Sequence, residues 1–394
     1  MTNRILTTDS LPQEELAVTP PTKRLRIGIT QGDTNGVGYE LILKTFAEPT
    51  MFDLCVPVVF GHPKAAQQHR KTLGLQTAFH PVASAAEAVP ERLNFVSCSS
   101  DELTVDFGRT TPEAGRAAFL SLEAAVAALR EGEIDALVTA PINKAGIQNS
   151  PEFHFVGHTE YLLDRFARLD SATAQASDKV EASPLDAHDA DNVLMVLFNE
   201  LMRVALVTTH LPLSEVPMAI TADSVEHKLR LFHRSLCRDF GLSNPRIAVL
   251  SLNPHSGDGG LLGAEEEEII KPVITATMES GITCFGPFAA DGFFGAGLYK
   301  QFDGVVAMYH DQGLTALKSL SFGDGVNFTA GLPIVRTSPD HGTAYDIAGQ
   351  GIAKPDSFRQ AIYAAIDICR HRAAYDEAHK DPLPKLYQER KERG

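Results

Sequence analysis

The stretch GVVAMYHDQGLTALKSL, residues 304–320, carries the pattern on which the fold prediction rests. Its small and apolar residues 305–308 are typical of a strand buried in an α/β sheet. The strand is expected to stop at His310 and Asp311, and the chain to turn at Gly313. A histidine beside an aspartate fits either a structural core histidine or a metal or proton-transfer site, because open α/β folds bind ligands at the carboxyl edge of the sheet.

Two other apolar stretches end in the same way. His210 ends VALVTTH and His255 follows IAVLSLNP. If the three strands are parallel, His210, His255 and His310 lie at one edge of the sheet, where their imidazoles can reach one ion. A lone strand-end histidine is more often structural, but three of them favour a catalytic site for a divalent metal, in which some positions stay open. Zn is the favoured ion, with Mg, Co and Mn as alternatives.

The rest of the chain extends the α/β pattern. Residues 25–30 are typical of a strand, 112–132 of a long amphipathic helix, and 134–147 of a strand that runs into a Pro-containing loop, so parallel β-α-β units are expected. A length of 394 residues is enough for two such domains. Residues 1–24 are predicted to form a loose extension, and the small, acidic segment 168–192 a surface insertion.

Composition restricts the class of protein. The net charge of −15 argues against a general nucleic-acid or anionic-membrane binder, so an anionic substrate would need positive charges gathered in a pocket. No apolar run reaches the length of a membrane span, and the N-terminus lacks a signal-peptide core. Five widely spaced cysteines are typical of reduced thiols. A cytoplasmic protein is expected.

Several polar residues could bind an anion. Lys318, Asn327 and Arg336 lie in or next to a Gly-rich region, where Lys and Arg could clamp an anion, although each alone could be ordinary surface charge. His158 and Thr159 stand at a probable helix start, which suits a carboxylate or phosphate unless Thr159 only caps the helix.

Two further motifs are less specific. The glycine loop GITQGDTNGVG (28–38) matches neither the dinucleotide nor the Walker pattern, so a tight turn and a ligand-lining role are equally open. The run EEEE (265–268) is expected to be a solvated helical turn.

Together the motifs resemble one family, the 4-hydroxythreonine-4-phosphate dehydrogenases of pyridoxal phosphate biosynthesis. The matching stretches are ITQGDTNGVG, TAPINK, GHTEYL, VTTHLPL, LNPHSGDGG, AMYHDQG, GVNFTAGLPIVRTSPDHGTA and GQG, which span most of residues 25–365. The stretch after Asp340 also resembles the adenine-binding loop of isocitrate and isopropylmalate dehydrogenases.

The resemblance implies an α/β fold of two α/β/α domains with a central cleft, isocitrate/isopropylmalate dehydrogenase-like, in a homodimer whose metal ligands are shared across the interface. The first domain, on the NAD side, would comprise 25–155 plus 321–394, and the second, on the metal and dimer side, 156–320. The implied residues are His210, His255 and His310 for the metal; His158, Thr159, Lys318, Asn327 and Arg336 for the substrate; Asp291, Asp311 and Lys318 for catalysis; and His341, Gly342, Thr343 and Ala344 for the cofactor.

The implied reaction is oxidation of 4-phosphohydroxy-L-threonine to a 3-keto acid that decarboxylates to 3-amino-2-oxopropyl phosphate. NAD is favoured over NADP, because no basic residue follows HGTA to receive a 2′-phosphate. A paralogue that oxidises erythronate or threonate 4-phosphate and, more distantly, a three-histidine metal hydrolase or metal-binding protein stay open. The chain departs from the family pattern at Thr34, Asn35 and Tyr39, where Pro-Ala and Pro are usual.

Overall fold

The structure is a computed structural model that describes residues 24–148, 157–173, 193–321 and 323–381. The predicted N-terminal extension, apart from residue 24, and residues 174–192 of the predicted insertion lie outside this part. Residues 168–173, which were assigned to the insertion, are the end of a helix, α6 (His158–Thr173).

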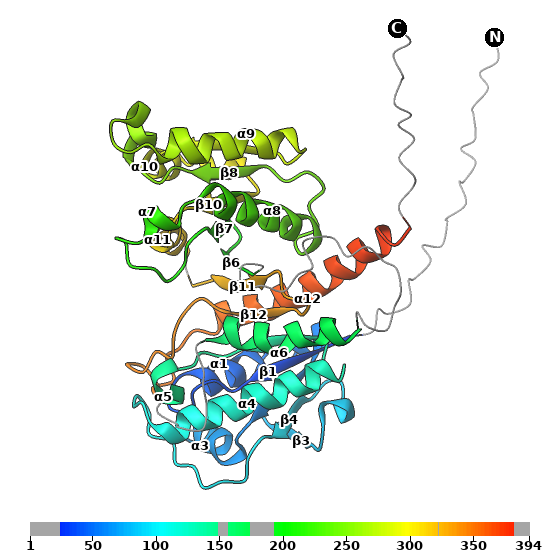
Figure 1. Ribbon diagram of the computed structural model, residues 1–394. Helices are drawn as coiled ribbons and strands as arrows, with labels where there is room; N and C mark the ends of the chain where they lie inside the picture. Colours follow the sequence, from blue (N-terminus) through cyan, green and yellow to red (C-terminus); the bar gives the residue numbers. More distant parts are fainter. Residues whose placement is uncertain (1–23, 149–156, 174–192, 322, 382–394) are drawn as a thin grey trace, which may run out of the picture.

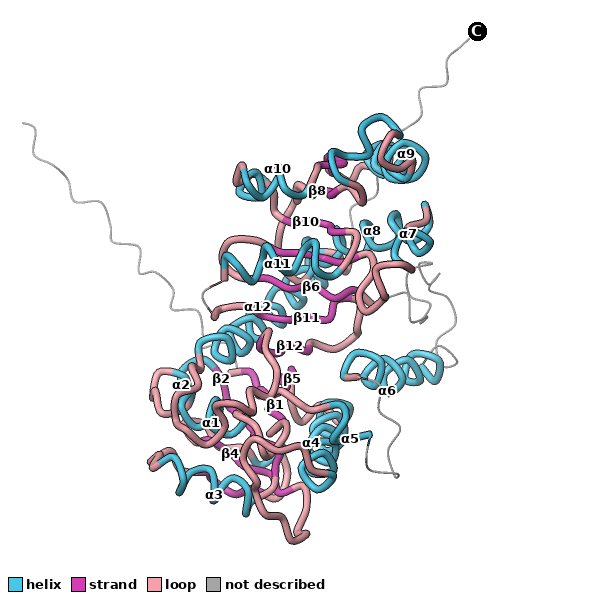
Figure 2. The backbone as a smooth tube through the Cα atoms, turned by 90° about the vertical axis from the view of Figure 1, so that its left-hand side faces the viewer, coloured by secondary structure: helices cyan, strands magenta, loops and turns pink. Residues whose placement is uncertain are grey.

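A single twelve-stranded sheet runs through the molecule in the order β3-β4-β2-β1-β5-β12-β11-β6-β7-β10-β8-β9. Figure 2 shows its strands following one another in one column, with helices on both sides. The strands are β1 (Leu25–Thr30), β2 (Cys55–Gly61), β3 (Phe79–Val82), β4 (Leu93–Ser97), β5 (Ala136–Thr139), β6 (Leu194–Phe198), β7 (Arg203–Leu206), β8 (Ile247–Leu250), β9 (Cys284–Phe288), β10 (Gly304–Ala307), β11 (Val326–Ala330) and β12 (Arg336–Pro339).

The helices cover the two faces of this sheet (Figure 1). They are α1 (Gly38–Thr45), α2 (Met51–Leu54), α3 (Pro63–Leu73), α4 (Pro112–Arg130), α5 (Lys144–Gln148), α6, α7 (Val216–Ala219), α8 (Ala222–Arg238), α9 (Lys271–Glu279), α10 (Ala290–Gly295), α11 (His310–Leu320) and α12 (Asp356–Ala378). Local sequence explains where two of the longer helices start: the Thr111 hydroxyl accepts from the Ala114 amide ahead of α4, and Thr221 and Ser224 form a capping box at α8. Within the described residues, no helix is long and apolar enough to cross a membrane.

The predicted parallel arrangement is confirmed for the three strands that precede the histidines. β10 pairs in parallel with both β7 and β8, so the chain leaves all three strands at the same edge. The predicted turn at Gly313 is wrong, because α11 begins at His310 and Gly313 lies in its first turn. A Cβ on Gly313 would lie 2.7 Å from Val204 Cγ1, so the glycine is what lets α11 pack closely on the sheet.

The middle of the sheet is antiparallel. β11 pairs antiparallel with both β12 and β6, and β6 forms an antiparallel pair with β7. Since side chains alternate along a strand, Val326 and Phe328 of β11 enter the core formed with α8 and α12, whereas Asn327 points to the other face. β11 thus presents different residues to the two sides of the sheet.

Helix α6 lies in the lower half of Figure 1, beside α4. Its residues Leu162 and Phe166 are buried in one cluster with Leu122 of α4 and Leu137 of β5. Helix α6, which follows the domain boundary predicted at 155/156, thus packs with elements of the first half of the chain. The domain division itself stays a prediction.

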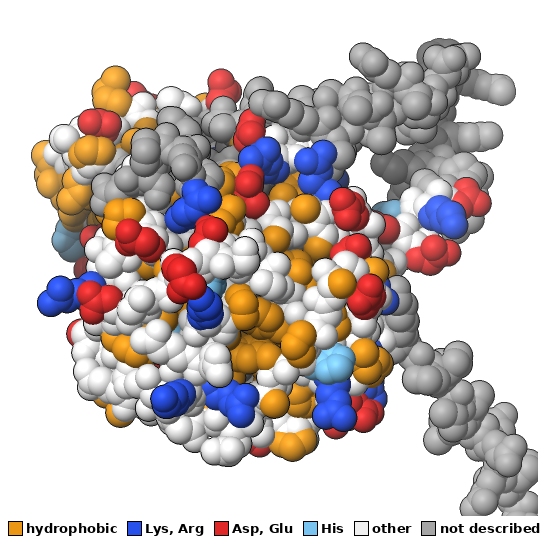
Figure 3. Space-filling model, turned by 90° about the horizontal axis from the view of Figure 1, so that it is seen from below, with side chains coloured by type: hydrophobic (Ala, Val, Ile, Leu, Met, Phe, Trp, Pro, Cys, Tyr) orange, Lys and Arg blue, Asp and Glu red, His pale blue; other side chains and the backbone are white. Residues whose placement is uncertain are grey.

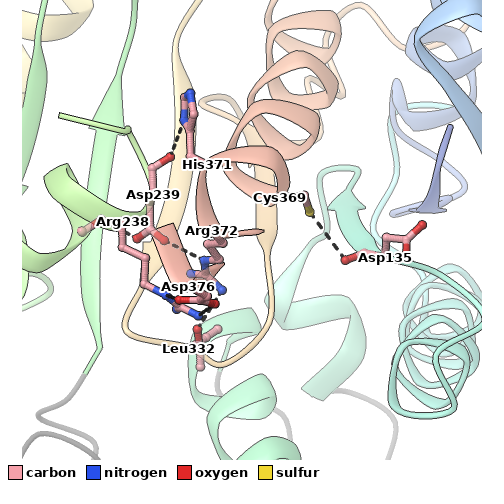
Figure 4. A network of polar contacts seen from close by, with 9 residues as sticks. Asp135, Arg238, Asp239, Leu332, Cys369, His371, Arg372 and Asp376 are labelled. Carbon is pink, nitrogen blue, oxygen red and sulfur yellow. Dashed lines mark hydrogen bonds and ion pairs between the residues drawn. The ribbon is translucent and has the colours of Figure 1, made fainter. Parts of the chain in front are cut away.

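The two halves are also tied together by polar contacts between α8 and α12, drawn in Figure 4. Arg372 Nε of α12 donates to Asp239 Oδ1, directly after α8, at 2.6 Å, and both side chains are buried. A second ion pair, between Arg238 and Asp376, is bidentate and more exposed. The continuous sheet and these contacts make the halves one body.

Candidate functional site

A pocket of about 290 Å³ lies where the chain leaves β5 and β12 and meets α11. It joins both halves of the sequence, since Thr139 comes from β5 and Lys318 from α11. Its lining comprises Thr139, Ala140, Pro141, Ile142, Lys144, His158, Lys318, Asn327, Arg336, Ser338, Pro339, Asp340, His341 and Gly342. Four of the five residues predicted to bind substrate are therefore brought together; the fifth, Thr159, lies just behind them, with its hydroxyl 3.5 Å from that of Thr329.

Arg336 is the buried cation of the pocket, with 4% of its surface exposed. Its Nε and Nη2 donate to Thr139 Oγ1 at 3.0 and 2.7 Å, across the parallel pair β12–β5. These two hydrogen bonds fix the orientation of the guanidinium. Arg336 thus places a buried cationic side chain in the wall of the pocket.

Lys318 and Asp340 form the ion pair of the pocket, with Lys318 Nζ 3.2 Å from Asp340 Oδ1. Burial raises the pKa of the Asp340 carboxyl, and the neighbouring Lys318 opposes that rise. Because Lys318 is half exposed, its ammonium can turn from the carboxylate to a ligand. Asp340 was not predicted as a site residue, although it precedes His341 in the sequence.

His158 begins α6 and lines the same pocket. Desolvation holds the pKa of its imidazole well below the usual range, and the charges of Arg336 and Lys144 lower it further. The ring is therefore neutral near pH 7. Lys144, the last residue of the motif TAPINK, is a second pocket cation that sequence reasoning missed; its place after a buried strand was the available signal.

Asn327 supplies a further indication of a ligand. Its Oδ1 is buried and has no hydrogen-bond partner among the residues that the structure describes. A buried acceptor without a partner is unfavourable, so a donor from outside the chain is expected beside it.

The predicted cofactor residues continue from this pocket into an exposed loop. His341 and Gly342 line the pocket, and Thr343 and Ala344 follow them. The glycine loop lies against this segment: the Val37 amide donates to Thr343 O at 3.1 Å, and a Cβ on Gly36 would lie 2.8 Å from the same oxygen. The glycine therefore permits close contact between the two loops.

A buried carboxylate fixes this contact. The Tyr345 hydroxyl donates to Asp33 Oδ2 at 2.8 Å. Burial raises the pKa of the Asp33 carboxyl, while Tyr345 and the Asn35 amide oppose that rise. Burial and the neighbouring Asp33 in turn raise the pKa of Tyr345 to about 12. Asp33 was not predicted as a site residue.

Two of the three predicted metal ligands come together. The rings of His210 and His310 have centroids 5.9 Å apart. His310 Nδ1 lies 2.7 Å from Asp311 Oδ1; we assign the proton to Nδ1, which leaves the Nε2 lone pair for a metal. His255 is exposed on the neighbouring loop, and Asp291 is exposed in α10. In the described ranges, no group of three or more His, Cys, Asp or Glu side chains could hold a metal, so the three-ligand set stays a prediction.

The loop that carries His255 is held by a carboxylate. Glu266 Oε1 accepts from the Leu252 and Asn253 amides at 2.8 and 2.7 Å, and Oε2 accepts from Asn253 Nδ2 at 3.0 Å. Glu266 is fully buried, so the prediction of a solvated EEEE turn is wrong at this position. Its hydrogen bonds offset its burial.

Charge elsewhere is mixed. On the face shown in Figure 3, acidic and basic side chains are interspersed among apolar ones. The grouping of Lys144, Lys318 and Arg336 around one pocket is therefore notable in a chain with a net charge of −15.

Comparison with known proteins identifies relatives along most of the chain. Residues 53–365 match the family model of the pyridoxal phosphate biosynthetic protein PdxA. A 4-hydroxythreonine-4-phosphate dehydrogenase of Bacteroides thetaiotaomicron is 54% identical over 369 residues, which are 94% of this chain and 95% of that protein. One from Sulfurihydrogenibium sp. is 38% identical and covers 88% of this chain and 99% of its own.

Solved structures show the same fold. The crystal structure of a 4-hydroxythreonine-4-phosphate dehydrogenase from Klebsiella pneumoniae, 33% identical, aligns with a TM-score of 0.71 over 88% of this chain and 99% of that chain. A terephthalate 1,2-cis-dihydrodiol dehydrogenase from Burkholderia xenovorans, 23% identical over 88% of this chain and 98% of that one, shares the fold alone, with a TM-score of 0.56. The predicted α/β fold class is confirmed.

Proposed function

Because this chain belongs to the PdxA family of 4-hydroxythreonine-4-phosphate dehydrogenases, and is thus an oxidoreductase of pyridoxal phosphate biosynthesis, we propose that it catalyses the reaction for which those relatives are named. The substrate would be 4-phosphohydroxy-L-threonine, oxidised by NAD to a 3-keto acid that loses carbon dioxide to give 3-amino-2-oxopropyl phosphate. The observation that carries the proposal is the cationic pocket between the two halves.

The pocket suits a substrate with two anionic groups. Arg336 and Lys318 would hold the phosphate and the carboxylate by charge-assisted hydrogen bonds, with Lys144 as a third cation. His158 is neutral, so it would contribute hydrogen bonding rather than a positive charge to the pocket. The buried Asn327 Oδ1 would accept a hydrogen bond from the substrate. Lys318, now paired with Asp340, is the residue we expect to exchange protons with the substrate.

The cofactor would bind beside this pocket. Membership of a dehydrogenase family implies a nicotinamide cofactor, and we propose NAD, with its adenosine along residues 341–344. The glycine loop contacts that segment through the hydrogen bond to Thr343 O, and the Asp33–Tyr345 hydrogen bond holds the residue that follows it. NAD, when bound, accepts the hydride, and the residues of the chain hold the donor carbon close to it.

A divalent metal fits the histidine pair. Two imidazoles side by side, one of them held by a carboxylate at Nδ1, are donors that zinc and related ions prefer. We propose that His210 and His310 bind the ion together with His255, and that Asp311 and Asp291 are the acidic residues around it. Such an ion would lower the pKa of the substrate hydroxyl as a Lewis acid.

We propose a homodimer that shares this metal site. Beyond His210 and His255 the chain exposes large apolar side chains, with Leu213 69%, Met218 84% and Leu261 78% exposed. Apolar surface next to an incomplete ligand set is what an interface with a second copy would cover.

We also propose a cytoplasmic location. All five cysteines are free thiols, which agrees with it.

The test is NADH formation from NAD and 4-phosphohydroxy-L-threonine, with and without a chelator, compared with erythronate and threonate 4-phosphate. We expect activity with the first substrate, loss of activity on chelation, and recovery when zinc is restored. Faster oxidation of a sugar-acid phosphate would show that the chain is a paralogue with another substrate. NAD binding without turnover of any of the three would contradict the proposal.

A further inference from the structure

A second pocket, of about 200 Å³, lies behind the first. Val326 of β11 lines this second pocket, whereas the adjacent Asn327 lines the first. Since successive side chains point to opposite faces of a sheet, the two pockets lie back to back across β11. The second pocket lies between the β6–β7 turn and α12, and no residue of the proposed active site lines it.

Its lining contains two buried donors that lack acceptors. Asn199 Oδ1 accepts from the Leu201 and Met202 amides at 2.9 and 3.0 Å, which fixes the orientation of the amide. Its Nδ2 is then the remaining donor, and it has no partner in the part of the chain that the structure describes. Asn199 is only 8% exposed.

The second donor is Arg203. Its guanidinium lies over the Phe240 ring at 4.9 Å, and Nη1 donates to Asp303 O at 3.3 Å. Its Nε is buried without an acceptor, and among the described residues no carboxylate lies within ion-pair distance of the guanidinium. Burial lowers the pKa of Arg203, and the charge of the neighbouring Asp303 opposes that fall. A carboxylate from outside would satisfy both donors.

The rim of the pocket has the opposite charge. Glu200 and Asp367 are exposed there, and Asp324 is partly exposed. Among the described residues, the ion-pair contact of Asp367 is a long one, 3.9 Å, with Arg370. The Asp239 carboxylate, by contrast, is already paired with Arg372, as Figure 4 shows. The walls between the donors and the rim are apolar and include Phe198, Phe240 and Ile368.

We propose that this pocket binds a small zwitterion with an apolar body, of the amino-acid class. Its carboxylate would accept from Asn199 and Arg203, its apolar part would pack on Phe198 and Phe240, and its ammonium would face the carboxylates of the rim. The site is separate from the proposed active site, so its occupancy can be measured without any enzymatic activity.

Three probes with the same aromatic body test this assignment by calorimetric titration of the full-length protein. L-Phenylalanine carries both charges, 3-phenylpropanoate lacks the ammonium, and 2-phenylethylamine lacks the carboxylate. We expect saturable binding of L-phenylalanine and binding at least about tenfold weaker for the other two, because each lacks a charged partner. Absence of saturable L-phenylalanine binding, or equal binding of all three, would overturn the proposal.

Variants place the ligand. Asn199→Asp keeps the oxygen that caps the turn but replaces the free donor by a negative acceptor, so L-phenylalanine binding should fall by at least about tenfold. Asp367→Asn should weaken it a few-fold, whereas Asp53→Asn, which removes an exposed carboxylate outside the pocket lining, should leave it unchanged. Thermal unfolding without ligand verifies that each variant is folded. Undiminished binding by folded Asn199→Asp would refute the placement.

Discussion

The buried ion pair between Asp239 and Arg372 predicts a large loss of stability when the aspartate is removed. Asp239 Oδ1 accepts from Arg372 Nε at 2.6 Å, and Oδ2 accepts from the Ser235 hydroxyl at 2.7 Å. The two side chains are only 4% and 8% exposed. Within the described part of the chain, Asp239→Ala would leave the buried Arg372 guanidinium with the Leu332 carbonyl, at 3.2 Å, as its remaining hydrogen-bond acceptor. We therefore expect the free energy of unfolding to fall by about 3–5 kcal/mol.

The pair Arg238–Asp376 provides a matched control, because it joins the same two helices (Figure 4). Its hydrogen bonds, 2.8 and 2.7 Å, are as short, but its side chains are 25% and 53% exposed. Asp376→Ala should therefore cost only about 0–1 kcal/mol, since water can solvate the remaining arginine. Urea unfolding of wild type and both variants measures the difference. If Asp239→Ala cost no more than Asp376→Ala, burial would not be what makes the first pair important.

Three other perturbations probe the site. Lys318→Met should raise the KM for the phosphorylated substrate, and it should raise the pKa of Asp340 further, because the carboxyl loses the cation 3.2 Å away. The pH dependence of KM should therefore shift. An unchanged pH profile would contradict the role of Lys318. His158 should make the protein less stable in acid: its folded pKa is depressed, so below about pH 6.5 the unfolded chain binds a proton that the folded chain does not, and stability falls by up to about 1.4 kcal/mol per pH unit. His158→Gln should flatten the pH dependence of urea unfolding below that pH, and parallel curves would refute this. Glu266→Gln should disturb the loop of His255 and lower the affinity for divalent metal by about 10–100-fold, measured as metal retained after dialysis; normal retention would show that the loop does not position a ligand.

The sequence predicts the regular parts of the fold well. The strand 25–30 is confirmed, and the helix expected over 112–132 is α4, Pro112–Arg130. Parallel pairing of the strands before His210, His255 and His310 is also confirmed. These elements are long or strongly patterned, so local sequence determines them.

The failures have physical causes. Gly313 indicates a turn by composition, but it is glycine because a helix packs tightly against the sheet there. Glu266 belongs to a run of charged residues, yet its carboxylate is buried. It accepts hydrogen bonds there from backbone amides of a loop 13 and 14 residues earlier. Both result from contacts between distant segments, which no local pattern records. The antiparallel pairing of β11 is of the same kind.

The sequence predicted which residues could bind the substrate, but not how they are arranged in space. His158, Lys318, Asn327 and Arg336 line it, but their roles in binding stay predictions. Lys144 and Asp340 stood inside motifs that the sequence showed, next to residues that were chosen. Lys144 and Asp340 become candidates only because the fold places them in the same pocket as Arg336 and Lys318.

The continuous sheet has a consequence for how the cleft can open. In a two-domain enzyme whose halves are joined by single strands of linker, closure is a rotation about a few backbone bonds. Here β5, β12, β11 and β6 are hydrogen-bonded neighbours, so the halves are connected by a ladder of backbone bonds across the whole width of the junction. Any closure on substrate must therefore be a torsional deformation, in which the sheet changes its twist by small amounts at each strand pair. The stiffness of that motion is set by the residues of β11 and β12, two of which, Asn327 and Arg336, line the substrate pocket itself.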